Sequence, residues 1–129
     1  MGGAHGTLEV TVVEGRNLKD HDVVGKNDAY VELYLDKAYK QRTTIVKDTN
    51  HPTWNQRFTF NLQKNDDHLH FHVYDDDVVS RDSIGSTKID LKKYVFGKGV
   101  YNQWITLSSM LGRYSKGEIH VIIEHRITN

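Results

Sequence analysis

Residues 68–77 have the sequence His68-Leu69-His70-Phe71-His72-Val73-Tyr74-Asp75-Asp76-Asp77. Apolar side chains occupy every second position from Leu69 to Val73, and histidines fill the positions between them. Successive side chains of a β-strand point to opposite faces of the sheet, so this alternation predicts a half-buried strand. The strand leads directly into three aspartates, which indicate a polar connection at its end.

The same two-residue alternation recurs on both sides of this strand. It predicts further strands at 8–12, 30–35, 54–62 and 119–124, with weaker candidates at 41–46, 84–90 and 102–107. One short helix is expected at 90–96, with Asp90 as its N-cap and Gly97 after its end. Many short alternating strands with polar connections predict an all-β fold, an eight-stranded antiparallel β-sandwich.

Length and composition limit the classes of protein that the chain can represent. Its 129 residues suit one domain, which we expect to span 1–129. Lysine plus arginine equals aspartate plus glutamate, 17 each, so bulk charge does not drive binding to nucleic acid. The absence of cysteine excludes disulfides, thiolate nucleophiles and thiolate metal sites. We expect a cytoplasmic protein, because the chain has neither a hydrophobic signal region nor an apolar run long enough to span a membrane.

Aspartate accounts for 12 of the 17 acidic residues, and its distribution is uneven. Three aspartates are expected between the first two strands and four between the fifth and sixth, namely Asp20, Asp22 and Asp28, then Asp75, Asp76, Asp77 and Asp82. If chain direction alternates, both connections emerge at the same end of the sandwich. Clustered carboxylates repel one another unless a cation compensates them, and calcium accepts six to eight oxygen ligands in flexible geometry. The cluster therefore predicts a calcium site, with solvated turn aspartates as the alternative.

An EF-hand does not explain the cluster. In a loop that starts at Asp20, Val24 and Val31 stand where ligands are required, and no flanking helices are predicted.

Three separate segments resemble signatures of the C2 domain, a calcium-dependent phospholipid-binding fold. They are residues 17–31 (NLKDHDVVGKNDAYV), residues 50–60 (NHPTWNQRFTF), and 73–77 (VYDDD) together with 82–85 (DSIG). The resemblance covers residues 6 to about 125, and the sequence is most similar to small single-domain plant C2 proteins such as the elicitor-responsive proteins. It implies a C2 fold of the second (type II) topology, with calcium-binding loops at one apex.

The resemblance also implies which residues bind calcium. The metal ligands would be the five aspartates that match the family motif, Asp22, Asp28, Asp75, Asp77 and Asp82. Additional ligands would be the backbone carbonyls of Val23 and Asp76, the Ser80 side chain and the extra carboxylate of Asp20. This set would hold one or two calcium ions.

Two valine pairs lie inside the acidic connections, Val23-Val24 in the first and Val78-Val79 in the second. We expect these side chains to insert into the lipid interface once calcium has offset the surrounding charge; the alternative is that they fold back over their own loops. The expected function is therefore calcium-dependent binding to anionic phospholipid such as phosphatidylserine, in calcium signalling or membrane targeting. The protein would be a monomer, recruited to the membrane when calcium rises.

A second lipid site is implied more weakly. Basic residues gather around the expected second and third strands, and family members bind phosphoinositides at such a patch. The counterparts here would be Tyr30, Lys40, Arg42 and Trp54, although Glu32 stands where those members carry lysine. The alternative is a solvated basic face. The His68, His70 and His72 row spans about 13 Å, too far for all three to reach one metal ion without a bend.

Two rival functions remain open. One is a calcium-independent module that binds a protein partner on the same fold. The other is a metal-dependent hydrolase, which an acidic cluster alone does not exclude. The chain has no Gly-x-Ser-x-Gly motif, P-loop or cysteine nucleophile, so we do not expect an enzyme.

Overall fold

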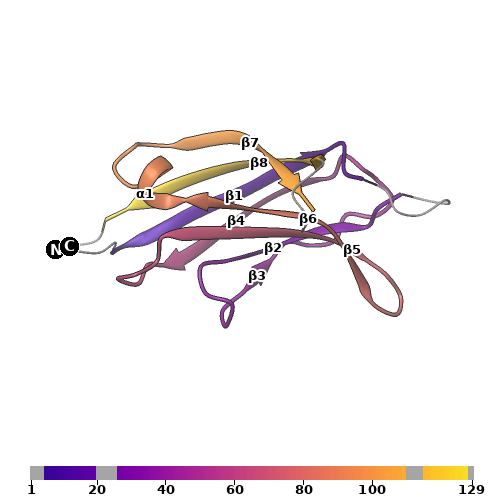
Figure 1. Ribbon diagram of the computed structural model, residues 1–129, viewed down its shortest axis with the longest axis horizontal. Helices are drawn as coiled ribbons and strands as arrows, with labels where there is room; N and C mark the ends of the chain where they lie inside the picture. The colour runs from indigo at the N-terminus through magenta and orange to yellow at the C-terminus, as the bar shows by residue number, and fades with distance from the viewer. Residues whose placement is uncertain (1–4, 20–25, 110–114, 128–129) are drawn as a thin grey trace.

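The computed structural model describes residues 5–19, 26–109 and 115–127 (Figure 1). The elements are β1 (Thr7–Arg16), β2 (Ala29–Tyr34), β3 (Gln41–Arg42), β4 (Thr53–Asn61), β5 (His68–Asp76), β6 (Arg81–Asp90), α1 (Leu91–Tyr94), β7 (Tyr101–Ser108) and β8 (Ser115–Arg126). Every strand pair is antiparallel. The predicted all-β, eight-stranded antiparallel fold is confirmed.

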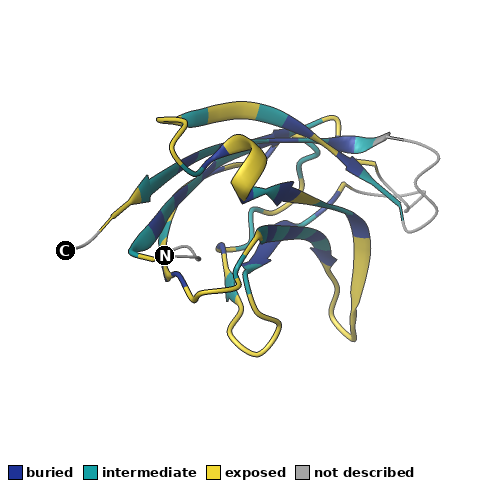
Figure 2. Cartoon of the chain, turned by 60° about the vertical axis from the view of Figure 1, so that its left-hand side comes forward, coloured by how far each residue is buried: buried dark blue, intermediate teal, exposed yellow. Residues whose placement is uncertain are grey.

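The strands form one hydrogen-bonded sheet that folds over itself into two layers. The strand order is β3-β2-β5-β6-β7-β8-β1-β4. β6 and β7 are joined through a single residue pair, Ser86 with Ser108, and the sheet turns over at that junction. Figure 2 shows the two layers with their buried residues facing each other. The strands at the two ends of the order, β3 and β4, therefore lie on the open side of the sandwich.

The core is built from the alternating apolar positions of the strands. In β5, Leu69, Phe71 and Val73 are at most 1% exposed, whereas the histidines between them are partly exposed. The same pattern places Val10 of β1, Leu33 of β2 and related side chains in the interior. Burial of this apolar surface is the dominant favourable contribution to folding. The predicted register of inward and outward faces is thus confirmed.

The less regular segments depart from the predicted bounds. The strand expected at 41–46 is reduced to Gln41–Arg42 plus one isolated bridge between Ala29 and Val46. The helix is shorter than expected, Leu91–Tyr94, but Asp90 caps it by accepting the backbone N–H of Lys93 at 3.1 Å. Strands β5 and β6 are longer than predicted at the ends that meet the acidic residues.

Candidate functional site

The acidic β5–β6 connection is a tight hairpin rather than a long loop. Asp75 pairs in register with Asp82, and Asp76 pairs with Arg81. The expectation that all four aspartates lie in the connection is wrong, because strand pairing continues through three of them. Only Asp77 to Ser80 remain between the strands. There the Asp77 N–H donates to the Ser80 carbonyl at 2.9 Å.

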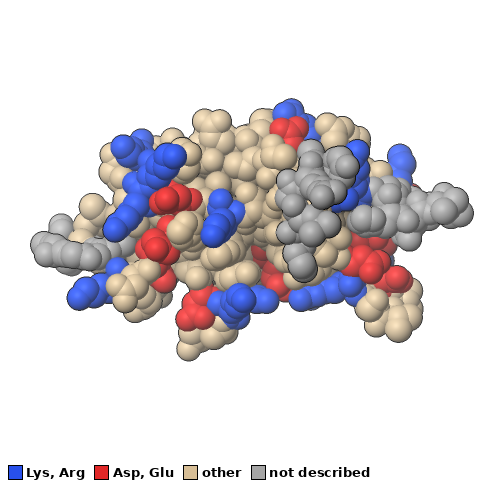
Figure 3. Space-filling view, in the orientation of Figure 1, with Lys and Arg blue, Asp and Glu red and all other residues tan. Residues whose placement is uncertain are grey.

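The tip of this hairpin is apolar and fully accessible. The Val78 and Val79 side chains are 100% and 92% exposed. The Val78 N–H donates to the Asp77 carboxylate Oδ1 at 2.6 Å, so the acid turns back beneath the valines. The hairpin extends beyond the body of the sandwich, and acidic side chains gather at its base (Figures 1 and 3). The arrangement places an exposed apolar tip directly next to carboxylates.

Asp28 is fixed by three hydrogen bonds, two to this hairpin and one to the β3–β4 connection. Its N–H donates to the Asp75 carboxylate Oδ1 at 2.7 Å, and its carbonyl accepts the Asp76 N–H at 2.9 Å. Its own carboxylate Oδ1 accepts the Asp48 N–H at 2.7 Å. Asp75 is only 7% exposed, so a buried carboxylate lies at this end of the fold. The structure therefore brings Asp28 and Asp75 together from strands far apart in sequence.

Asp48 is a neighbour of the site that the sequence analysis did not identify. It lies in the β3–β4 connection, is exposed, and has a left-handed backbone with φ of 55°. In the sequence, Asp48 is a single aspartate within a polar stretch, and no pattern marks it as part of a site. The pairing of Ala29 with Val46 and the bond from the Thr49 N–H to the Asn27 carbonyl, at 2.9 Å, draw this connection toward Asp28.

The predicted ligands are only partly assembled within the described residues. Asp20, Asp22, Val23 and Val24 lie outside them. Across the described ranges, no three histidine or acidic side chains form a group that could hold a metal ion. The donor set is nevertheless one of carboxylate oxygens, which suits the hard cation Ca²⁺ and does not suit a soft transition metal. Asp77 and Asp82 are exposed and Ser80 lies at the turn, so these side chains are accessible to an ion.

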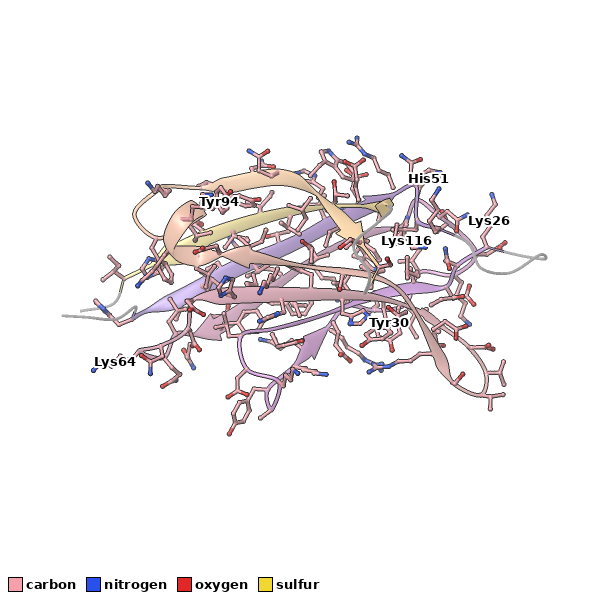
Figure 4. All side chains as sticks on the ribbon, viewed as in Figure 1. Lys26, Tyr30, His51, Lys64, Tyr94 and Lys116 are labelled. Atoms are coloured by element: carbon pink, nitrogen blue, oxygen red, sulfur yellow. The ribbon has the colours of Figure 1, made fainter. Side chains whose placement is uncertain are left out.

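The outer face of β2 and β5 carries a cluster of aromatic and charged side chains near the same hairpin (Figure 4). Tyr30 stacks on Tyr74 with ring centroids 5.7 Å apart. The Arg81 guanidinium lies 3.8 Å from the Tyr74 ring centroid and donates to the Tyr30 hydroxyl and to Glu32, at 3.2 and 2.8 Å. Lys40 completes the cluster with an ammonium nitrogen 3.2 Å from Glu32.

Glu32 is the centre of charge compensation in this cluster. It is 8% exposed, and burial alone would raise the pKa of its carboxyl. Hydrogen bonds and positive charge from Arg81 and Lys40 outweigh burial and hold that pKa below its usual value. The carboxylate is thus ionised and engages two cations, of which Lys40 was expected to face a lipid headgroup.

Trp54 does not lie on this face. Its side chain is 6% exposed, and its indole N–H donates to the Ala29 carbonyl at 3.1 Å. Trp54 occupies an inward position of β4, so it packs in the core. The aromatic side chain beside Tyr30 is instead Tyr74, whose outward direction follows from the alternation in β5.

The histidine row of β5 is engaged with neighbouring polar and aromatic side chains. His70 stacks on Tyr34 with ring centroids 4.8 Å apart. His72 stacks on Tyr74 at 4.1 Å, and its Nε2 lies 2.6 Å from the Ser83 hydroxyl. Its Nδ1 lies 3.1 Å from the Tyr74 hydroxyl. Partial burial lowers the pKa of both His70 and His72.

This burial predicts a loss of stability in mild acid. A histidine whose pKa is lower in the folded state binds fewer protons there than in the unfolded state, so the free energy of unfolding falls as pH drops below about 6.5. In the His72→Gln variant we expect a smaller fall between about pH 7 and pH 5. Urea unfolding at a series of pH values measures this slope. An unchanged slope in His72→Gln would contradict the prediction.

Comparison with known proteins establishes the family. Residues 6–107 match the family described as the C2 domain. The chain belongs to the C2 domain family. Domains of this family are in general membrane- and lipid-binding modules. Within the described residues, no helix has the length and apolar character to cross a membrane.

Similarities to individual relatives and solved structures support the assignment to the C2 domain family. The chain is 32% identical over 93 residues to the "Calcium-dependent lipid-binding protein" of Arabidopsis thaliana, covering 71% of this chain and 18% of that protein. The structure resembles a C2 domain of plant extended synaptotagmin 1, with a TM-score of 0.85, 25% identity and 96% of each chain covered. It also resembles a C2 domain-containing protein from a putative elicitor-responsive gene, with a TM-score of 0.81, 26% identity, and 100% and 94% of the two chains covered. The similarity predicted to the elicitor-responsive proteins is confirmed.

The chain spans 13% to 20% of the length of four Arabidopsis thaliana relatives that it matches. What those whole proteins do is therefore a property of much longer chains.

Proposed function

We propose that this C2 domain binds anionic phospholipid membranes in a calcium-dependent manner, in calcium signalling or membrane targeting. The observation that carries the proposal is the β5–β6 hairpin, in which two fully exposed valines adjoin Asp77 and lie next to the Asp28–Asp75 contact. A cytoplasmic monomer recruited by a rise in calcium is part of the same proposal. The similarity to the Arabidopsis thaliana "Calcium-dependent lipid-binding protein" supports it.

Calcium would be held by carboxylates from two segments, the β1–β2 connection and the β5–β6 hairpin. We assign the role of ligand to Asp22, Asp28, Asp75, Asp77 and Asp82, with the Val23 and Asp76 carbonyls, Ser80 and Asp20 as further donors to one or two ions. When bound, the ion offsets the carboxylate charge and offers a coordination position to a lipid oxygen. The backbone bonds of Asp28 to Asp75 and Asp76 hold the acids in place before the ion arrives.

The valine tip would supply the apolar part of the membrane contact. An exposed valine gains about 1.5 kcal/mol or more when it is fully buried away from water. Without calcium, the adjacent carboxylates repel an anionic surface and resist desolvation. The tip and the ion would therefore act together, and Val23 and Val24 would add to the tip.

In the same proposal, a phosphoinositide would bind on the face of Tyr30 and Tyr74, with Lys40 and Arg42 as its cations. The Tyr30 side chain is itself only 2% exposed, so the headgroup would contact the residues that cover it. Glu32 limits the positive charge that this face offers to a headgroup, because it already pairs with Lys40 and Arg81. Arg42 lies over the Tyr30 ring at 5.2 Å and has no ion pair among the described residues. We therefore rank phosphatidylserine bound at the apex above a phosphoinositide bound on this face.

The test is co-sedimentation with phosphatidylserine-containing vesicles, with calcium and with chelator. The wild-type protein should sediment with calcium only. The Asp77→Asn, Asp82→Asn double variant should sediment no more in calcium than in chelator, because both changed side chains are proposed ligands.

A matched control removes two carboxylate charges elsewhere. Asp36→Asn with Asp90→Asn makes the same charge change, and both side chains accept a backbone N–H that asparagine can also accept. This control should retain calcium-dependent sedimentation. If the Asp77, Asp82 variant retains it as well, the ligand assignment is wrong. If wild-type protein binds no vesicles in either condition, the rival module that binds a protein partner without calcium is favoured.

A further inference from the structure

The open side of the sandwich exposes the edge of strand β4. β4 is last in the strand order and pairs only with β1. The Leu62 N–H donates to the Gly6 carbonyl at 3.0 Å, so even-numbered residues here bond toward β1 and odd-numbered residues bond away from it. The Thr59 carbonyl accordingly accepts a hydrogen bond from outside the sheet, from the Gln41 amide Nε2 at 2.9 Å. The backbone of Arg57, Thr59 and Asn61 therefore faces outward.

Side-chain amides, rather than a strand, cover part of this edge. Besides the Gln41 contact, Gln56 Oε1 accepts the Thr44 N–H at 2.6 Å. β3, on the facing edge, has only two residues. Within the described ranges, no residue bonds to the outward N–H and C=O groups of Arg57 and Asn61. Such a row of backbone donors and acceptors is a template for another strand.

A groove runs beside the same edge. Its volume is about 760 Å³, and its walls include Tyr39, which is 77% exposed, and Phe60. Two carboxylates line it, Asp36 and Asp66, and each accepts a backbone N–H of its own turn, at 2.9 and 2.7 Å. The one cation of the lining, Lys40, is paired with Glu32. The groove is thus amphipathic, and within the described part of the chain neither of its two carboxylates forms an ion pair.

We propose that the β4 edge binds an extended, basic segment of a partner protein by strand addition. The segment's backbone would pair with the outward groups of Arg57, Thr59 and Asn61, and would displace the Gln41 amide. In an added strand, alternate side chains point to opposite faces. The set that faces the groove would carry lysine or arginine toward Asp36 and Asp66, with its alkyl stems along Tyr39, and the other set would point away from the groove.

This site lies away from the proposed calcium apex. Asp36 follows the end of β2, whereas Asp28 precedes its start. Lys26 lies two residues before Asp28, and Lys64 follows the groove residue Gln63. These two lysines are at opposite ends of the molecule (Figure 4). The inference goes beyond the proposed function and does not depend on it, because a peptide bound here would leave the valine tip accessible.

The test is fluorescence polarisation with a labelled eight-residue peptide of alternating lysine and valine. We expect saturable binding to the full chain and none by a glutamate–valine peptide of the same length. Two further peptides carry N-methyl groups on either the lysine or the valine amides. Only one set of amides faces β4, so one of these peptides should bind about 150-fold more weakly, for three lost hydrogen bonds of about 1 kcal/mol each. The other should bind like the parent.

Substitutions in the protein, rather than in the peptide, test the same contact. Thr59→Pro removes an outward N–H and no bond of the ladder to β1, so affinity should fall about five-fold. Thr59→Ala keeps that N–H and is the matched control, with unchanged affinity. Asp36→Asn with Asp66→Asn should weaken binding, whereas Asp77→Asn with Asp82→Asn should not.

Three results would overturn the proposal. They are absence of binding at millimolar peptide, equal weakening by both N-methylated peptides, and light scattering that shows a dimer which Thr59→Pro dissociates. The last result would identify a second copy of the chain as the occupant of the edge.

Discussion

Replacing Val78 and Val79 with asparagine is expected to weaken the binding of calcium-loaded protein to phosphatidylserine vesicles about 100-fold. Two valine side chains moved from water into the lipid interface contribute roughly 3 kcal/mol, which corresponds to about two powers of ten in affinity. Both side chains are at least 92% exposed, so their loss removes no packing from the fold. Vesicle titration measures the affinity, and calorimetry with calcium alone should give the same calcium affinity as wild type.

The control for this prediction is Val100→Asn. Val100 is also exposed, at 58%, but it lies between α1 and β7. This variant should bind vesicles like the wild type. Wild-type vesicle affinity in the Val78, Val79 variant would show that the tip does not enter the membrane, and the valines would then need another explanation.

Phe71→Ala is expected to lower the free energy of unfolding by about 3–5 kcal/mol. Phe71 is 1% exposed in the middle of β5, opposite Leu33 of β2 and Thr87 of β6. Its truncation removes buried apolar area and leaves a cavity that strands fixed on both sides cannot close. Since domains are stable by only about 5–15 kcal/mol, this loss should remove a large share of the total stability and shift the urea midpoint strongly downward.

Urea unfolding followed by tryptophan fluorescence measures this loss. Tyr94→Ala is the control, because Tyr94 is 47% exposed and its truncation should cost about 1 kcal/mol or less. A loss below about 1 kcal/mol for Phe71→Ala would contradict the core described here.

The strands could be predicted because their signal is local. The alternation in β5, with Leu69, Phe71 and Val73 on one face, follows directly from the geometry of a strand half-buried in a sheet. The Asp90 cap could be predicted for the same reason, since an N-cap bonds to a residue of its own first turn. Where the local pattern was weak, as at 41–46, pairing with distant strands decided how much of the segment became a strand.

The candidate site was harder to predict from local sequence patterns than the strands were. The motif placed Asp28 and Asp75 in separate connections, but their direct contact depends on β2 pairing with β5. Asp48 lies at the same site because Ala29 pairs with Val46, and no local sequence pattern predicts that pairing. The family resemblance implied that Trp54 contacts a lipid headgroup, but Trp54 lies in the core, on the face that it shares with Phe60 in the alternation of β4.

By itself, the sequence determined that this chain is an all-β C2 domain, and that many of its aspartates and both valine pairs gather in two segments, residues 20–28 and 75–82. Both properties rest on residue types and spacings along the chain. Only the tertiary structure decided that Glu32 engages Lys40 and Arg81, and that β4 keeps an open edge beside an acidic groove. The physical reason is that charge compensation and strand pairing join residues distant in sequence, so their outcome depends on which elements become neighbours.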